Sequence, residues 1–291
     1  MIQQTIKGIL IPVGGAEDKG TDLEKGVIER NRMNFFELGI LKQIVDKIGG
    51  EKRIEVVTTA SSIADEVIDN YVSAFQKLGD SNVGHMRIRE RKDVDTPDML
   101  ERLRKADCIM FSGGNQLRLS SIFGGTEFLE ILKQRYHDEP FVIAGTSAGA
   151  MAMSHTMIYE GNATSAHLKG EVKMTTGLGF MDNVIIDSHF DKRGRFPRLA
   201  QAVAANPGAI GIGLSEDTGV MVENGNQITA IGSGAVYIFD GKNIDHNNIG
   251  DAETGKPISF SNMIVHIMCS GNRYNTSTRI FEANEILLAE H

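Results

Sequence analysis

A serine between two glycines is the residue of this chain best placed for covalent chemistry. Gly145, Ser147 and Gly149 form a G-x-S-x-G motif that follows the apolar run 141–143 and precedes a segment rich in Ala and Met. In such a strand-to-helix turn the glycines allow a tight reversal, and the serine hydroxyl is exposed in a strained conformation. The motif predicts a nucleophile elbow at Ser147; the alternative is a helix start that only packs closely against a sheet.

A serine hydroxyl is a poor nucleophile and needs a base within hydrogen-bond reach. Of the eight histidines, His189 ends the apolar, strand-like run 184–190, where a loop and a site are expected. His155 follows the elbow helix on a path leading away from the serine, and His266 lies in an apolar strand, which is typical of a structural residue. We therefore predict that His189 is the base.

Two carboxylates compete for the role of orienting the imidazole and stabilising its charged form. Glu216 follows the apolar run 209–214 and is the preferred candidate. Glu160, at the end of the segment MIYEG, is the alternative. The order Ser147, His189, Glu216 would be that of neither chymotrypsin nor the α/β-hydrolases.

An oxyanion hole needs two backbone amides near the serine, one of them from the following residue, here Ala148. The second is expected from Gly113 or Gly114, which end the predicted strand 107–111. Gln116, just beyond, can bind a substrate amide or carboxylate. A Gly-Gly turn with a capping Asn is the simpler alternative for this loop.

Positive charge is concentrated directly after His189, in the run Lys192, Arg193, Arg195 and Arg198. In an acidic chain this pattern predicts an anion-recognising loop, whereas a solvated surface is the alternative. Asp187, on the other side of the histidine, can meet a cationic group.

Composition limits the class of protein. The chain has 291 residues, of which 41% are hydrophobic and 23% charged, as in ordinary soluble proteins. Its net charge of −8 argues against a general nucleic-acid binder. Cys108 and Cys269 lie in apolar runs and are expected to be buried. Since no run reaches the length of a membrane span or signal peptide, we expect a cytoplasmic protein without membrane contact.

The rhythm of the chain predicts the elements that position these residues. Short apolar strands alternate with amphipathic helices in the first half, which indicates a doubly wound, mainly parallel α/β sheet flanked by helices. The strands are expected at 7–13, 53–60, 85–88, 107–111 and 141–143, and the helices at 33–48, 62–78, 97–105 and 116–136.

After Gly179 short strands separated by turns predict a mostly antiparallel, hairpin-rich extension. The strands are expected at 184–190, 209–214, 219–223, 227–231 and 235–240, with a final strand pair in 262–269 and 278–283. We expect one domain over residues 1–291, with a parallel part (1–180) and the extension (181–291).

Taken together, the motifs resemble those of the cyanophycinases, serine peptidases of the peptidase E-like family S51. The resemblance spans nearly the whole chain and is carried by IPVGGAED, FSGGNQ, GTSAGA, DSHFDKRGRFPRL and GLSEDTG. It implies a fold like that of class I glutamine amidotransferases. It also implies a homodimeric exopeptidase without metal or other cofactor. The implied substrate is cyanophycin, a poly-aspartate with arginine on each β-carboxyl, and the implied products are β-aspartyl-arginine dipeptides.

The resemblance also implies roles for single residues. Ser147 looks like the nucleophile and His189 like the base, and the pocket residues would be Gln116, Asp187, Arg193, Arg195 and Arg198. Ser188 stands where the family usually has a glutamine, so one substrate contact would differ. An aspartyl dipeptidase like peptidase E and a non-catalytic binder of a charged peptide or polymer are the alternatives. A glutamine amidotransferase is disfavoured because residue 147 is not cysteine.

Overall fold

A nine-stranded sheet crosses the molecule, and its strand pairing changes from parallel to antiparallel at the middle strand. The structure is a computed structural model that describes residues 5–20, 34–49 and 52–284. The parallel half of the sheet consists, in spatial order, of β1 (Ile9–Val13), β5 (Val142–Thr146), β4 (Cys108–Phe111), β2 (Ile54–Val57) and β3 (Val83–Met86). From β1 the sheet continues antiparallel through β10 (Thr218–Glu223), β11 (Gln227–Gly232), β14 (Arg273–Asn275) and β15 (Ile280–Glu282).

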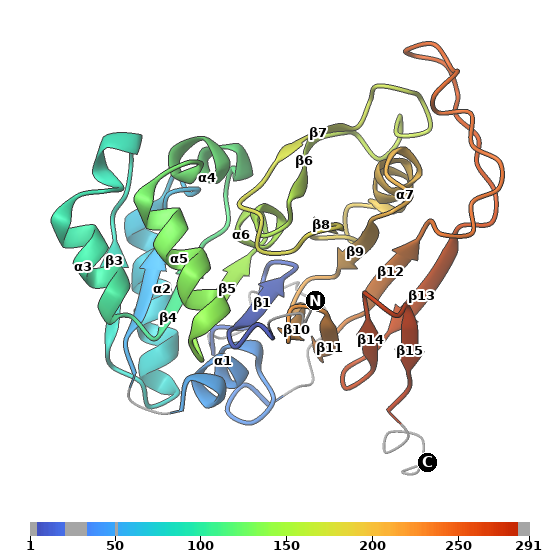
Figure 1. The fold of residues 1–291 in the computed structure, drawn as a ribbon. Coiled ribbons are helices and arrows are strands. Elements are labelled where there is room, and N and C mark those ends of the chain that lie inside the picture. Colours follow the sequence, from blue (N-terminus) through green and yellow to red (C-terminus); the bar gives the residue numbers. More distant parts are fainter. Residues whose placement is uncertain (1–4, 21–33, 50–51, 285–291) are drawn as a thin grey trace.

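Helices cover both faces of the parallel half, as predicted for a doubly wound fold (Figure 1). One face packs on α1 (Ile40–Ile48) and α2 (Ala64–Lys77), and the other on α3 (Pro97–Lys105), α4 (Gln116–Phe123), α5 (Glu127–Asp138) and α6 (Ala148–Ala152). Strand residues alternate between these two cores: in β5, Val142 and Ala144 join the first and Ile143 the second. Continuous apolar runs are required because both faces of the strands are buried.

A second sheet of four strands carries much of the later sequence. Its order is β13 (Ile264–Met268), β12 (Val236–Asp240), β9 (Ile210–Leu214) and β8 (Val184–Asp187). β8 and β9 are parallel, and the chain between them forms α7 (Phe196–Ala205), which contacts both strands. β6 (Thr156–Glu160) and β7 (Lys173–Thr176) form a separate hairpin. No helix in the described ranges is both long and apolar enough to cross a membrane.

Several predicted elements differ from those observed. The helix predicted over 33–48 begins only at Ile40, because residues 35–38 form a turn in which the Asn34 side chain accepts a hydrogen bond from the Phe36 amide. Its predicted first residue, Met33, lies outside the described residues, and its predicted end at Ile48 is confirmed. The helix predicted over 116–136 is two helices, since Gly124 ends α4 and the Thr126 side chain caps α5.

The expected final strand pair is wrong. β13 pairs with β12 in the smaller sheet, whereas β15 pairs with β14 in the larger one. The helix α7 was not predicted; it includes Arg198, which the sequence analysis placed in a loop. Cys108 is buried as expected, but Cys269 is exposed.

Candidate active site

The turn at Ser147 has the geometry of an elbow. The serine lies between β5 and α6 with φ +50° and ψ −107°, a conformation that side-chain-bearing residues rarely adopt. Its amide donates to the Val13 carbonyl at 2.9 Å, which ties the turn to β1. A Cβ at Gly149 would collide with the Phe111 carbonyl, and one at Gly145 would lie 2.8 Å from the Gly149 backbone. The glycines therefore allow α6 to start directly against the sheet.

Ser147, His189 and Glu216 form a chain of hydrogen bonds. His189 Nε2 lies 3.1 Å from Ser147 Oγ, and His189 Nδ1 lies 2.7 Å from Glu216 Oε1. His189 and Glu216 come close because each follows the carboxyl end of a strand, and these strands, β8 and β9, are parallel neighbours. An ionised carboxylate only accepts hydrogen bonds, so the Nδ1 nitrogen carries the proton and Nε2 is free to accept one from Ser147.

The glycine pair Gly14-Gly15, which follows β1, positions the histidine. His189 has φ +47°, and its amide donates to the Gly14 carbonyl at 2.8 Å. A Cβ at Gly15 would collide with the imidazole ring. The imidazole of His189 therefore packs directly on the turn after β1. The sequence feature that could have predicted this role is the pair of consecutive glycines at the carboxyl end of a strand.

The environment keeps His189 neutral and Glu216 ionised near pH 7. Burial lowers the pKa of His189 and outweighs the hydrogen bond to Glu216, while the positive charge of Arg193 lowers it further. For Glu216, burial acts to raise the pKa, but hydrogen bonds from Lys192 and His189 together hold the pKa below its usual value. Lys192 Nζ donates to Glu216 Oε2 at 2.8 Å.

The Gly113-Gly114 loop, which follows β4, passes beside the serine. A Cβ at Gly113 would lie 3.4 Å from Ser147 Cβ, and Gly114, with φ +139°, packs directly on the Ala60 carbonyl. Ala148 is the first residue of α6, where a helix amide has no acceptor within the helix. Ala148 thus lies at the elbow and the Gly113-Gly114 loop passes beside it, and the oxyanion role of their amides stays a prediction.

Ser147 and His189 open into a cleft of about 900 Å³. Glu17, at its wall, is only 4% exposed and was missed by the sequence analysis. It accepts hydrogen bonds from Tyr71 Oη and Thr146 Oγ1, both at 2.5 Å, and pairs with Lys19 at 3.0 Å. Burial acts to raise the pKa of Glu17, but Lys19 and these hydrogen bonds hold it below the usual value. The cationic side chains lining the cleft are Lys19, Arg89, Arg118 and Arg193.

The arginines after His189 differ in orientation: one faces the cleft and two contact a buried carboxylate. Arg193 is exposed and lines the cleft. Arg195 and Arg198 instead turn onto Asp187, a fully buried carboxylate, with contacts of 3.0 Å from Arg195 Nη1 and 2.8 Å from Arg198 Nε. Burial lowers the pKa of Arg195 to about 10, so its guanidinium is still charged at neutral pH. For these three inward residues, a contact with substrate stays a prediction.

Two other predicted pocket residues also have partners inside the protein. The buried Ser188 hydroxyl lies 3.3 Å from Met151 Sδ. Gln116 Nε2 donates to the Ile158 and Tyr159 carbonyls of β6 at 3.1 and 3.3 Å. Neither side chain lines the cleft beside Ser147.

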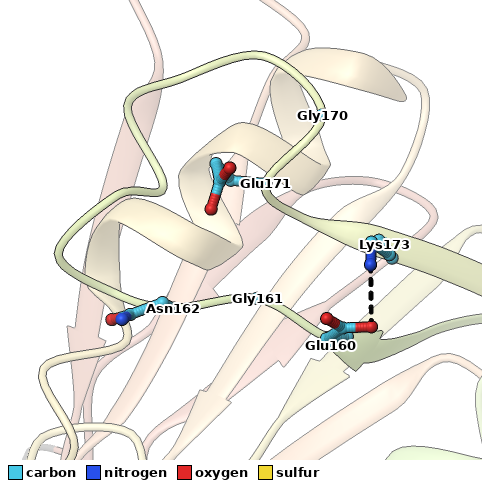
Figure 2. Close-up of a pocket in the computed structure, with 6 residues that line it drawn as sticks. All are labelled: Glu160, Gly161, Asn162, Gly170, Glu171 and Lys173. Atoms are coloured by element: carbon cyan, nitrogen blue, oxygen red, sulfur yellow. Dashed lines mark hydrogen bonds and ion pairs between the residues drawn. The ribbon is translucent and has the colours of Figure 1, made fainter. Parts of the chain in front are cut away.

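Glu160, the alternative acid, is not near His189. It pairs with Lys173 at 2.9 Å, and both residues line a separate pocket of about 430 Å³ together with Glu171 (Figure 2). The structure thus brings Glu216 and not Glu160 to the histidine. Within the described ranges, no group of three or more His, Cys, Asp or Glu side chains is arranged to hold a metal ion.

Comparisons with known proteins identify the family and the fold of the chain. The sequence profile of peptidase family S51 matches residues 31–230. The cyanophycinase of Synechococcus elongatus is 33% identical over 273 residues, which are 94% of this chain and 80% of that protein. The cyanophycinase of Geminocystis herdmanii is 32% identical over 278 residues, 95% and 97% of the two chains. The crystal structure of a peptidase from an acI-B1 Actinobacterium shares the fold, with a TM-score of 0.64 at 20% identity over 94% of this chain and 98% of that one.

Proposed function

The chain belongs to peptidase family S51 and is a serine-type peptidase, and from this premise we propose that it hydrolyses cyanophycin through a Ser147-His189-Glu216 triad. The observation that carries the proposal is the hydrogen-bonded chain of these three side chains at the edge of an open cleft. The substrate is proposed because the relatives that align over nearly the full chain are named cyanophycinases.

In the proposed mechanism His189 Nε2 takes the proton of Ser147 Oγ as this oxygen attacks an α-peptide carbonyl. The amides of Gly114 and Ala148 stabilise the resulting oxyanion. The imidazolium, held by Glu216, then gives its proton to the leaving amine, and an acyl-enzyme remains on Ser147. His189 next deprotonates a water molecule, which hydrolyses the ester and releases a β-aspartyl-arginine dipeptide.

Arg193 is proposed to bind substrate carboxylates directly, because it is exposed in the cleft. Gln116, Asp187, Ser188, Arg195 and Arg198 remain proposed pocket residues on the resemblance. The hydrogen bonds of Gln116 favour a role in tying α4 to β6, and those of the other four residues favour a role in holding the segment around His189. A cytoplasmic homodimer is likewise proposed on the sequence and the resemblance alone.

The test is incubation with cyanophycin and, separately, with short aspartyl peptides, followed by mass spectrometry of the products. The proposal expects β-aspartyl-arginine from the polymer, covalent labelling of Ser147 by a fluorophosphonate, and neither reaction with Ser147→Ala. Cleavage restricted to short aspartyl peptides would indicate an aspartyl dipeptidase. Polymer binding without labelling or turnover would indicate a non-catalytic binder.

A further inference from the structure

We infer that the cleft holds several units of a polymeric substrate at once, and that Arg118 and Arg89, at the end away from Ser147, bind carboxylates on units distant from the bond that is cleaved. This inference rests on the proposed function, since it names the part of the substrate that the cleft outside the triad recognises. Arg89 and Arg118 belong to none of the sequence motifs and contact no residue of the proposed triad.

The shape of the cleft follows the edge of the parallel sheet. Ser147 follows β5, Asn115 lies beyond β4, Ser61 and Ser62 beyond β2, and Arg89 beyond β3, and all of them line the cleft. These four strands are consecutive neighbours. With a spacing of about 4.8 Å between strands, the three steps from β5 to β3 cover about 14 Å. An extended chain rises about 3.5 Å per residue, so roughly four residues fit along this path.

The two distal arginines are placed for an anionic ligand. Arg118 is half-buried, and its guanidinium donates to the Thr59 carbonyl at 2.8 Å and to the Arg89 carbonyl at 2.9 Å. These bonds hold its charged group at the cleft wall, and among the described residues no carboxylate pairs with it. Within the described part of the chain, Arg89 has no acidic partner either, whereas nearby Arg87 pairs with Asp65. Unpaired guanidinium groups lining a cleft favour a carboxylate-bearing ligand.

The chemistry of cyanophycin fits this arrangement. Each aspartate β-carboxyl is consumed in the amide to arginine, so the free anion of every unit is the arginine α-carboxylate. A polymer therefore presents one carboxylate per unit along its length. Arg193 at the near end and Arg118 with Arg89 at the far end can bind carboxylates of different units. A two-unit oligomer is too short to reach both ends of the cleft.

The test compares kcat/KM for β-Asp-Arg oligomers of two and eight units, using wild type, Arg89→Gln, Arg118→Gln and the matched control Arg87→Gln. Each cleft variant is expected to lower kcat/KM for the eight-unit substrate roughly tenfold, the loss of about one charge-assisted contact. Neither should change kcat/KM for two units, and Arg87→Gln should change neither. Equal effects on both lengths, or none, would overturn the inference.

Two further measurements separate the possible failures. Arg118 also donates hydrogen bonds to two backbone carbonyls, so Arg118→Gln can disturb the fold. Its kinetics are used only if its melting temperature stays within a few degrees of wild type; otherwise the test rests on Arg89→Gln. Binding of both oligomers is then measured on Ser147→Ala, alone and combined with Arg89→Gln. Suppose that wild type cleaves neither oligomer, but that Ser147→Ala binds eight units more tightly than two and loses this preference when combined with Arg89→Gln. The proposed function then fails and the distal site stands. If binding shows no dependence on length or on Arg89, the site fails even where the polymer is cleaved.

Discussion

Two carboxylates, Asp187 and Glu216, have different environments although each lies at or just beyond the carboxyl end of one of two neighbouring parallel strands. Asp187 ends β8, is fully buried and is held between Arg195 and Arg198. Glu216 lies just beyond β9, has a side chain 25% exposed, and contacts His189 and Lys192. The difference shows that closeness in the fold is not enough: the partners of each carboxylate decide which of the two is free to hydrogen-bond the histidine.

The physical reason lies in the cost of burying charge. A fully buried carboxylate is tolerated only when ion pairs and hydrogen bonds compensate for the lost hydration. Asp187 satisfies this condition with two arginines, so both of its oxygens are committed to structure. Glu216 keeps some hydration and devotes one oxygen to the imidazole and the other to Lys192. Glu216 therefore has an oxygen in contact with His189 and can stabilise the imidazole when it becomes positively charged.

The largest expected effect is on turnover by Glu216→Gln. Loss of the carboxylate removes the partner that holds the tautomer of His189, and kcat should fall by about 10⁴-fold. Circular dichroism and thermal melting should show a folded protein. The matched control is Glu160→Gln, which removes a carboxylate paired with Lys173 far from the histidine. A full loss of turnover in that control, with Glu216→Gln active, would reverse the assignment.

Asp187→Ala should act mainly on stability. The substitution leaves the buried Arg198 and the half-buried Arg195 without their counter-charge, at a cost of about 3–5 kcal/mol in the free energy of unfolding. Urea denaturation measures this loss of stability, and Asp191→Asn, at an exposed carboxylate, is the control. If Asp187→Ala instead leaves the unfolding curve unchanged and abolishes polymer binding, Asp187 belongs to the substrate pocket and the contrast with Glu216 is lost.

Arg193→Gln should shift the pH profile. The base is active when neutral, so kcat/KM falls as the pH drops through the pKa of His189, which lies below its ordinary value. Removing the Arg193 charge raises this pKa, and the acid limb should move to higher pH. In Glu216→Gln the residual activity should show the opposite movement, because Glu216 raises the pKa. Profiles measured on one short substrate check both signs; shifts in the same direction would contradict them.

Lys192→Met is expected to have the smallest effect. The lysine is 66% exposed, and exposed ion pairs contribute little. Glu216 would lose one of the partners that lower its pKa but would stay ionised at neutral pH. We expect kcat to fall by less than about tenfold, a loss that high salt should mimic in wild type. A decrease as large as that of Glu216→Gln would mean that Lys192 is required to position the acid.

Local features of the site could be predicted from the sequence because they depend on nearby residues. G-x-S-x-G between an apolar run and an Ala-rich segment encodes its own backbone reversal, and the alternation of strands and helices indicates a doubly wound sheet. His189 was identified because it follows a buried strand. Each of these features is a property of a few consecutive residues, so no knowledge of distant contacts was needed.

The sequence favoured Glu216 but left Glu160 open as the alternative, and the tertiary structure separated the two, because their distance from His189 depends on which strands are neighbours. The parallel pairing of β8 and β9 brings Glu216 to His189, while the hairpin of β6 and β7 places Glu160 beside Lys173. The arginine run likewise could not be divided by sequence into the exposed Arg193 and the inward Arg198, since both are the same residue type. Burial of Asp187 decides their orientation, and burial is a property of the packed molecule.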